Sequence, residues 1–229
     1  MRETLVMLPG LASDGALFAA QVRDLADVAD VMIGDTLSDD SLPAMAARVL
    51  AAAPERFALA GLSMGGYLAF EIMRQAPERV TRLALLDTNA RADTPEARQT
   101  REESIAATAK YSYEKLTRSG LSRLMGPDAN PEVPRIALEM AVRTGVEVFV
   151  AQQRAIMARP DSRPLLPTIA VPTLVLVGAE DSVTPPALAR EMADAIAGAT
   201  LVEVPDCGHL SSLEQPDAVT AALMEWLAA

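Results

Sequence analysis

Cysteine and histidine, two side chains that often bind metals, are almost absent from this sequence. Its 229 residues include one cysteine, Cys207, and one histidine, His209. One cysteine cannot form an internal disulfide, which agrees with a reducing compartment, and one of each cannot build a structural zinc site. Any mechanism that requires a histidine base must therefore use His209.

Motifs for nucleotides and for other metals are also missing. No G-x-x-x-x-G-K-[ST] segment occurs, and no G-x-G-x-x-G follows a strand, so nothing indicates a nucleotide. Asp35, Asp39 and Asp40 are close in sequence, but a polar loop before a helix explains their spacing better than a metal-binding loop. We expect a protein with no bound metal and no cofactor.

Long apolar segments are absent as well. No run approaches the 18 or more apolar residues that a membrane-spanning helix needs, and the first residues lack the pattern of a signal peptide. The formal net charge of -11 argues against nucleic acid and anionic membranes, because both attract Lys and Arg. We expect a cytoplasmic protein, a monomer or homodimer, whose partner is a small molecule rather than nucleic acid or membrane.

The chain alternates between short apolar runs and helical stretches. The apolar runs are continuous and rich in Leu, Val and Ala, which is typical of parallel strands buried on both faces. They predict an α/β protein with a doubly wound, mostly parallel six-stranded sheet. The expected strands are 4–8, 31–33, 56–61, 83–86, 173–177 and 201–204, and the expected helices among them are about 16–29, 42–53, 64–76, 186–197 and 212–227.

Residues 91–168 interrupt this alternation. They have helical patterns over about 95–119 and 132–158, with a turn at Gly126-Pro127-Asp128. Two crossover helices would explain them, but the segment is far longer than one crossover needs, so we favour a lid over the strand ends. The expected domains are an α/β core of residues 1–90 and 169–229 and an inserted helical lid of residues 91–168.

A serine between glycines lies where a strand meets a helix. Ser63 is the centre of Gly61-Leu62-Ser63-Met64-Gly65. In this context G-x-S-x-G predicts a tight, strained turn that exposes the hydroxyl, and Gly61 and Gly65 avoid collisions with neighbouring backbone. An ordinary strand-helix turn that contains a serine is the alternative. The position in the third strand-helix unit favours a nucleophile.

The order of the other candidates along the chain agrees with a nucleophilic serine. His209 follows the last expected strand and Asp181 follows the one before it, so both should meet Ser63 at one edge of the sheet. A serine hydroxyl needs a base, and the base needs an acid to orient it. We predict that Ser63, His209 and Asp181 have these three roles. The rival acids are Glu180, Asp87 and Asp206.

Two backbone amides are the expected donors to an oxyanion. Met64 begins the helix after the serine, so its N–H should face the developing charge. The second donor is expected in the loop after the first strand, where Gly10 lets the backbone approach closely and Leu11 supplies the N–H. The sequence thus predicts an oxyanion hole formed by Leu11 and Met64.

Together these motifs resemble the α/β-hydrolase superfamily. The resemblance rests on residues 8–15, 61–66, 178–185 and 207–216 and covers essentially the whole chain, with residues 91–168 as the divergent part. The chain is most similar to small capped carboxylesterases akin to pimeloyl-carrier-protein methyl esterase and enol-lactone hydrolases. Two departures are expected to matter. Pro9-Gly10 stands where the family usually has His-Gly, which removes a polar group behind the oxyanion loop, and the first two strands of the family fold are lacking.

The resemblance and the candidate residues imply a serine carboxylic ester hydrolase that forms an acyl-enzyme with a small or medium, largely apolar ester. A cofactor-free perhydrolase or haloperoxidase, or a carbon-carbon bond hydrolase, would use the same three residues, and a hydrolase-fold small-molecule receptor would retain them for slow turnover.

Candidates for an apolar lid pocket are Met125, Met140, Phe149 and Met157, although such residues at helical spacing more often belong to a core. Candidates for binding a substrate carboxylate are Arg123, Arg143 and Arg154, with a solvated surface as the stronger alternative.

Overall fold

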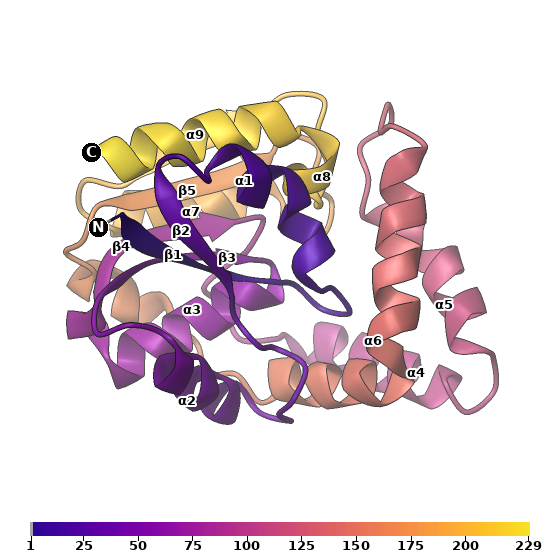
Figure 1. Ribbon diagram of the computed structural model, residues 1–229. Coiled ribbons are helices and arrows are strands. Elements are labelled where there is room, and N and C mark those ends of the chain that lie inside the picture. Colours follow the sequence, from indigo (N-terminus) through magenta and orange to yellow (C-terminus); the bar gives the residue numbers. More distant parts are fainter. Residues whose placement is uncertain (1) are drawn as a thin grey trace.

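Six parallel strands form one sheet at the centre of the protein (Figure 1). The structure, a computed structural model, describes residues 2–229. The strands are β1 (Glu3–Leu8), β2 (Ala29–Ile33), β3 (Phe57–Leu62), β4 (Val80–Leu86), β5 (Thr173–Gly178) and β6 (Thr200–Val204), and their order across the sheet is β2-β1-β3-β4-β5-β6. The predicted α/β class with a six-stranded sheet is confirmed, and every pairing is parallel.

The strands are apolar throughout because helices cover both faces of the sheet. In β3, Phe57 and Leu59 pack on one face, whereas Ala58, Ala60 and Leu62 pack on the other. The first face is covered by α2 (Leu42–Ala52), α3 (Met64–Gln75) and α7 (Pro186–Ala195), and the second by α1 (Ala19–Asp24) and α9 (Pro216–Ala228). Burial on both faces explains why the strand sequences do not alternate between apolar and polar residues.

The order of the strands reverses next to β1. After β2 the chain crosses to the other side of β1 to form β3, so β1 pairs with both strands. In open α/β sheets, ligands bind at the carboxyl ends of the strands beside such a reversal. Here the loop after β1 and the turn after β3 meet at that place, since a Cβ on Gly10 would lie 3.4 Å from the Cβ of Ser63.

Between β4 and β5 the chain forms a helical segment, residues 91–168, which stands beside the carboxyl ends of the strands (Figure 1). It contains α4 (Pro95–Ala107), α5 (Tyr113–Gly120) and α6 (Glu132–Met157). The helix expected over 95–119 is therefore two helices. Gly145, with φ 85° and ψ 165°, divides α6 into two parts that run in different directions. Both interruptions are local, so the helical pattern on each side of them persists in the sequence.

Two other predicted helices are also interrupted or shortened. The helix expected over 16–29 is shorter: a 3-10 turn, Gly15–Phe18, is followed by α1, which ends at Asp24, and Ala29 already begins β2. The helix expected over 212–227 is divided into α8 (Ser211–Glu214) and α9, because Pro216 has no N–H to continue the first and instead begins the second. None of the helices within residues 2–229 is long and apolar enough to span a membrane.

We predict that Gly65→Ala disrupts the contact between α3 and β1. A Cβ on Gly65 would overlap the carbonyl oxygen of Leu8, and two backbones cannot relieve this overlap without moving apart. We expect urea denaturation to show a free energy of unfolding lower by at least about 1–3 kcal/mol, the usual cost of overpacking. Gly120→Ala is the matched control, because a Cβ there meets nothing within 4 Å and alanine favours a helix. A Gly65→Ala protein as stable as the parent would contradict this packing.

Candidate active site

Ser63 lies in a strained turn between β3 and α3. Its φ of 56° and ψ of -115° are in a region that residues with a side chain rarely adopt. The turn is held by two hydrogen bonds: the Ser63 amide donates to the Leu86 carbonyl at 2.9 Å, and Thr88 Oγ1 donates to the Ser63 carbonyl at 2.8 Å. A Cβ on Gly61 would overlap the backbone of Gly65, so glycine is required where the strand and helix come this close.

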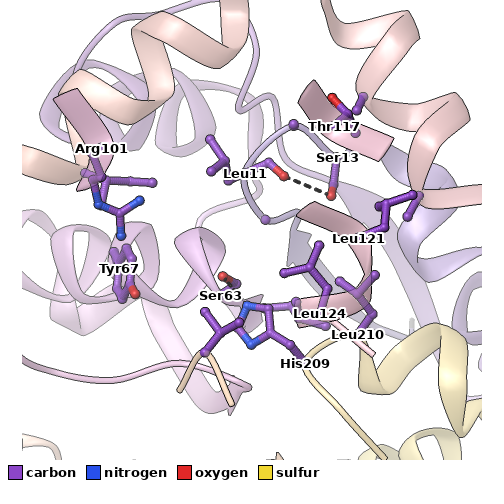
Figure 2. A pocket seen from close by; sticks show the side chains of 17 residues that line it. Leu11, Ser13, Ser63, Tyr67, Arg101, Thr117, Leu121, Leu124, His209 and Leu210 are labelled. Atoms are coloured by element: carbon purple, nitrogen blue, oxygen red, sulfur yellow. Dashed lines mark hydrogen bonds between the residues drawn. The ribbon is translucent and has the colours of Figure 1, made fainter. Parts of the chain in front are cut away.

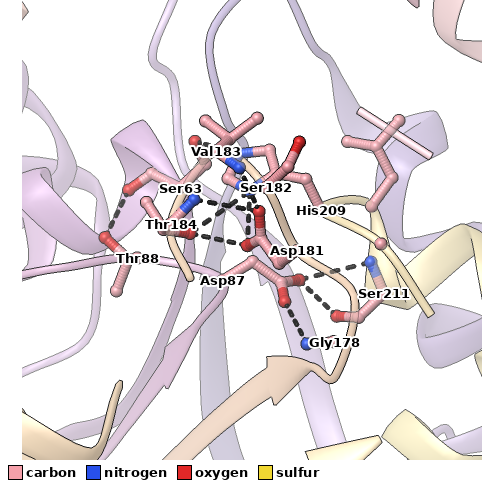
Figure 3. Close-up of polar contacts among 12 residues, drawn as sticks. Ser63, Asp87, Thr88, Gly178, Asp181, Ser182, Val183, Thr184, His209 and Ser211 are labelled. Carbon is pink, nitrogen blue, oxygen red and sulfur yellow. Dashed lines mark hydrogen bonds and ion pairs between the residues drawn. The ribbon is translucent and has the colours of Figure 1, made fainter. Parts of the chain in front are cut away.

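Ser63, His209 and Asp181 are joined by hydrogen bonds (Figure 3). His209 Nε2 lies 2.9 Å from Ser63 Oγ, and His209 Nδ1 lies 2.8 Å from Asp181 Oδ2. The residues follow β3, β6 and β5, so the parallel sheet brings all three to one edge. Only 4% of His209 and 2% of Asp181 is exposed. This arrangement can pass the hydroxyl proton to the imidazole while the other ring nitrogen donates to the carboxylate.

Asp181 is held as a carboxylate by the loop that carries it. Its Oδ1 accepts hydrogen bonds from the amides of Val183 and Thr184, at 2.8 and 2.9 Å, and its Oδ2 accepts from Thr184 Oγ1 at 2.6 Å. Burial alone would raise the pKa of Asp181, but the contacts with His209 and Thr184 lower it below its ordinary value. The negative charge is therefore in place to stabilise an imidazolium.

The surroundings of His209 favour its protonated form. Burial acts to lower the pKa of the imidazole, because it penalises the charged state. The hydrogen bond and charge of Asp181 act in the opposite direction, as do the charges of Asp87 and Glu214, and the net effect raises the pKa of His209 above its ordinary value. A raised pKa makes the neutral imidazole a stronger base towards the Ser63 hydroxyl.

The loop that carries His209 is fixed on both sides. Glu214 accepts hydrogen bonds from the amides of Gly208 and Leu210, each at 3.1 Å. The His209 amide donates to the carbonyl of Leu124, at 2.8 Å, which belongs to the helical segment. The position of the imidazole therefore depends on the core and on residues 91–168 together.

Of the rival acids, Glu180 and Asp206 are exposed, and only Asp87 is buried near the imidazole. Asp87 follows β4 and accepts hydrogen bonds from the Gly178 amide at 2.9 Å and from the amide and hydroxyl of Ser211. Burial raises the pKa of Asp87 to about 7. Its contacts join the end of β5 to the loop after the histidine (Figure 3), a support that the sequence does not predict.

The two amides predicted as oxyanion donors are free to bind a ligand as far as residues 2–229 are concerned. Among residues 2–229, the N–H groups of Leu11 and Met64 form no hydrogen bond. Leu11 lines the same cavity as Ser63, and Met64 is the first residue of α3. Unpaired amides at this edge can donate to an oxygen that acquires negative charge on a ligand.

Gln152, which no sequence motif marks, supports the loop that carries Leu11. It is fully buried in α6, where its Oε1 accepts a hydrogen bond from the Ala12 amide at 2.8 Å and its Nε2 donates to the Thr36 carbonyl at 2.9 Å. Because both ends of the side-chain amide are used, the loop is tied to the helical segment with no unpaired group on Gln152.

A cavity of about 160 Å³ lies next to Ser63 and His209 (Figure 2). Its size is similar to that of engineered cavities that hold benzene. Figure 2 shows leucines on one side of it and Tyr67 and Arg101 on the other. Its mainly apolar wall includes Leu62, Leu121, Leu124, Ala137, Ile156 and Leu210. Such a cavity suits a small apolar group placed beside a reacting bond.

The structure does not bring the predicted lid-pocket residues to this cavity. Met125, Met140 and Met157 lie outside its lining, and Phe149 lines only an adjoining hollow. Met140 is instead 1% exposed within the core on one face of the sheet. The lining contains their sequence neighbours Leu124, Ala141 and Ile156. Helical periodicity marks an apolar face, but it does not tell which residue of that face points toward the serine.

The cation at the cavity is Arg101, which sequence patterns did not single out. Of the three arginines named from the sequence, Arg143 pairs with Asp14 at 2.9 Å, Arg154 is exposed, and Arg123 lines the adjoining hollow. Arg101 lies on the helix α4, whose sequence is mostly polar. Its place at the cavity depends on where that helix packs, so the composition of the helix alone could not reveal it.

Known proteins share this architecture. A profile described as the Alpha/beta hydrolase family matches residues 6–222. BpoC of Mycobacterium tuberculosis, which carries the name of a non-heme bromoperoxidase, is 32% identical over 192 residues, 77% of this chain and 69% of that protein. A thermophilic esterase from Thermogutta terrifontis, solved with malate bound, has a TM-score of 0.90 and 31% identity and covers 99% of this chain and 89% of its own. The enol-lactonase from Burkholderia xenovorans LB400 has a TM-score of 0.90 and 28% identity and covers 100% and 92%.

We predict that NMR titration of the imidazole gives a pKa above the ordinary value of about 6.5. His209 is the only histidine, so its signals can be assigned directly. Asp181→Asn should lower this pKa, because the variant removes the charge that stabilises the imidazolium. Glu180→Gln, which removes the adjacent but exposed carboxylate, should not change it. A parent pKa below 6.5, or one that Asp181→Asn leaves unchanged, would contradict the proposed balance of burial and charge.

Proposed function

We propose that this chain, which belongs to the alpha/beta hydrolase family, is a serine hydrolase of small or medium, largely apolar carboxylic esters. The observation that carries the proposal is the hydrogen-bonded series Ser63, His209 and Asp181 beside a mainly apolar cavity. The similar esterase and enol-lactonase structures support it, because a lactone is a cyclic ester and both names describe cleavage of an ester bond.

In the first half of the proposed reaction, an acyl-enzyme forms on Ser63. His209 Nε2 takes the proton of Ser63 Oγ while the oxygen attacks the ester carbonyl carbon. The amides of Leu11 and Met64 donate to the oxyanion, and Asp181 stabilises the imidazolium. His209 then gives its proton to the alcohol oxygen as the carbon–oxygen bond breaks. The alcohol leaves and the acyl group stays on Ser63.

In the second half, water releases the acyl group. His209 takes a proton from the water as its oxygen attacks the acyl carbonyl, and the same two amides hold the second oxyanion. Return of the proton to Ser63 Oγ breaks the acyl–serine bond and releases the carboxylic acid. Apart from the ester and water, every group used in these steps is a residue of the chain.

Residues 91–168 serve in this proposal as a lid on the core of residues 1–90 and 169–229. Leu121, Leu124, Ala137 and Ile156 of the cavity wall belong to this segment, whereas Ser63 and His209 belong to the core. We infer that the lid selects the acyl group and that the core supplies the chemistry. The adaptable part of the site is then the helical segment inserted between β4 and β5, whereas the ends of the strands hold the reacting groups in fixed positions.

A peroxide-dependent reaction is a second candidate, favoured by the similarity to BpoC. In it, hydrogen peroxide takes the place of water: a peroxide oxygen attacks the acyl carbonyl, His209 accepts its proton, and a peracid leaves as Ser63 is regenerated. The peracid would oxidise halide. Peroxide- and bromide-dependent halogenation, compared with ester hydrolysis by the same preparation, distinguishes the two reactions.

We predict that Ser63→Ala and His209→Ala each lower kcat for 4-nitrophenyl esters of short acids by about 10⁴-fold or more, the usual result of removing the nucleophile or the base. Ser63→Ala should keep the unfolding temperature close to that of the parent, because it removes a single oxygen. His209→Ala should lower it, because the buried carboxylate of Asp181 loses its imidazole partner. Ser122→Ala, at an exposed serine of the helical segment, is the control and should be fully active. Turnover by Ser63→Ala at the parental rate would remove the proposed mechanism.

We predict that Gln152→Met lowers kcat and leaves KM nearly unchanged. Methionine retains the volume but cannot accept from Ala12, so the Leu11 amide next to it loses its fixed position. Complete loss of an oxyanion donor costs about 10²- to 10³-fold, and we expect an effect up to the lower end of that range. Thr36→Val is the control, because it keeps the backbone carbonyl that Gln152 binds and removes a hydroxyl without a partner. Unchanged kcat in Gln152→Met would show that the loop holds its position without this contact.

A further inference from the structure

The cavity next to Ser63 contains one permanently charged side chain. Among the residues that line it, Arg101 is the one arginine or lysine, and no lining residue is an aspartate or glutamate. His209, the other basic group, belongs to the proposed catalytic series. The rest of the wall is mainly apolar, so the charge of Arg101 is not offset by a negative group of the cavity itself.

Arg101 has an acidic partner, but it shares this partner with a second arginine. Arg101 Nε lies 2.7 Å from one oxygen of Asp93, and Arg159 Nη1 lies 2.7 Å from the other. Two positive charges less one negative charge leave this group with a net charge of +1. The side chains of Arg101, Asp93 and Arg159 are 22%, 3% and 6% exposed, so water screens the excess charge less than it would at the surface.

The guanidinium of Arg101 is also held in one orientation. Its Nη1 donates to Gln153 Oε1 at 2.7 Å, while its Nη2 donates to no group in the described part of the chain. Figure 2 shows the guanidinium directed toward Tyr67, over whose ring Arg159 lies at 4.1 Å. A planar donor that is fixed in advance loses little entropy when it binds a carboxylate.

The position of Arg101 relative to Ser63 indicates which part of an ester it would meet. In Figure 2, Arg101 and His209 lie on opposite sides of Ser63. The leaving alcohol takes its proton from His209, so it must lie on the histidine side. The acyl group then extends toward the other side, where Arg101 lies.

We propose that the substrates are esters whose acyl group carries a second, ionised carboxyl group, and that Arg101 binds this carboxylate. The proposal rests on ester hydrolysis at Ser63 and refines the substrate class for that site: the acyl chain is apolar where it meets the cavity wall and charged at the end that meets Arg101. The overall charge of -11 does not oppose it, because salt screens distant charges beyond about 10 Å whereas Arg101 acts at contact. If Arg101 only joined α4 to Asp93 and α6, anionic and neutral esters would be hydrolysed equally well.

The test compares monomethyl esters of straight-chain dicarboxylic acids with methyl esters of monocarboxylic acids of equal length. Methanol release is measured for the parent, Arg101→Met, Arg101→Lys and Arg98→Met. We expect the parent to prefer the anionic ester at one length or more, and Arg101→Met to lower kcat/KM for it about 10- to 100-fold, mainly through KM. Hydrolysis of the neutral esters should change little, and Arg101→Lys should keep part of the preference. Arg98→Met removes an exposed charge one turn earlier in α4 and should have no effect.

Equal hydrolysis of both ester types by the parent at every length, or a preference that survives Arg101→Met, would overturn the proposal and leave ester hydrolysis intact. Failure of the proposed function differs, because neither type would then be hydrolysed. If neither ester is hydrolysed, the role of Arg101 is tested by isothermal titration calorimetry on Ser63→Ala, which measures the binding of each ester without its hydrolysis. Tighter binding of the monomethyl dicarboxylate than of the neutral ester, lost when Arg101→Met is added, supports the role of Arg101. Equal binding of the two esters overturns it.

Discussion

The close approach of α3 to the ends of β1 and β3 is the constraint on which the site depends. Gly65 lies against the Leu8 carbonyl and Gly61 against the backbone of Gly65, so neither position has room for a side chain. The turn between them must be tight, and Ser63 is held in a backbone region that typically costs about 1–3 kcal/mol. Packing on both sides of the sheet offsets this cost. The serine hydroxyl, the first amide of α3 and the loop after β1 therefore meet at one point because of the sheet, and not because of the local sequence alone.

Around that point the protein places acidic side chains close to a buried imidazole. Asp181, Asp87 and Glu214 surround a single imidazole, and each accepts hydrogen bonds from neighbouring amides or hydroxyls. Burial acts to neutralise His209, whereas the carboxylates act to protonate it, and the second effect prevails. A buried network in which every member is paired is rigid, but removal of one member leaves the others uncompensated. The imidazole is thus both fixed in position and sensitive to its acidic neighbours.

Much of this arrangement could be predicted from the sequence. The six strands were predicted because continuous apolar runs mark strands buried on both faces, and Ser63, Asp181 and His209 follow the ends of such strands. Residues of the helical segment were harder to place. The predicted pocket residues Met140 and Met157 fall outside the cavity lining, because an amphipathic pattern identifies a buried face without identifying what covers it. Gln152 and Arg101 carry no local signal, since their importance arises from contacts with residues far away in the chain.

Gln152 and Arg101 show that the helical segment does more than cover the core. In a simple lid, residues 91–168 would cover the site and could vary without affecting bond cleavage. Here Gln152 binds the loop of the proposed oxyanion donor, where Pro9-Gly10 lacks the polar group usual in the family, and the Leu124 carbonyl binds the amide of His209. The wall that carries Arg101 is tied to the same helix, α6, through Gln153. A shift of α6 therefore moves the oxyanion loop and the anion-binding wall together, so selection of the acyl group and stabilisation of the transition state are coupled in the proposed enzyme through one helix.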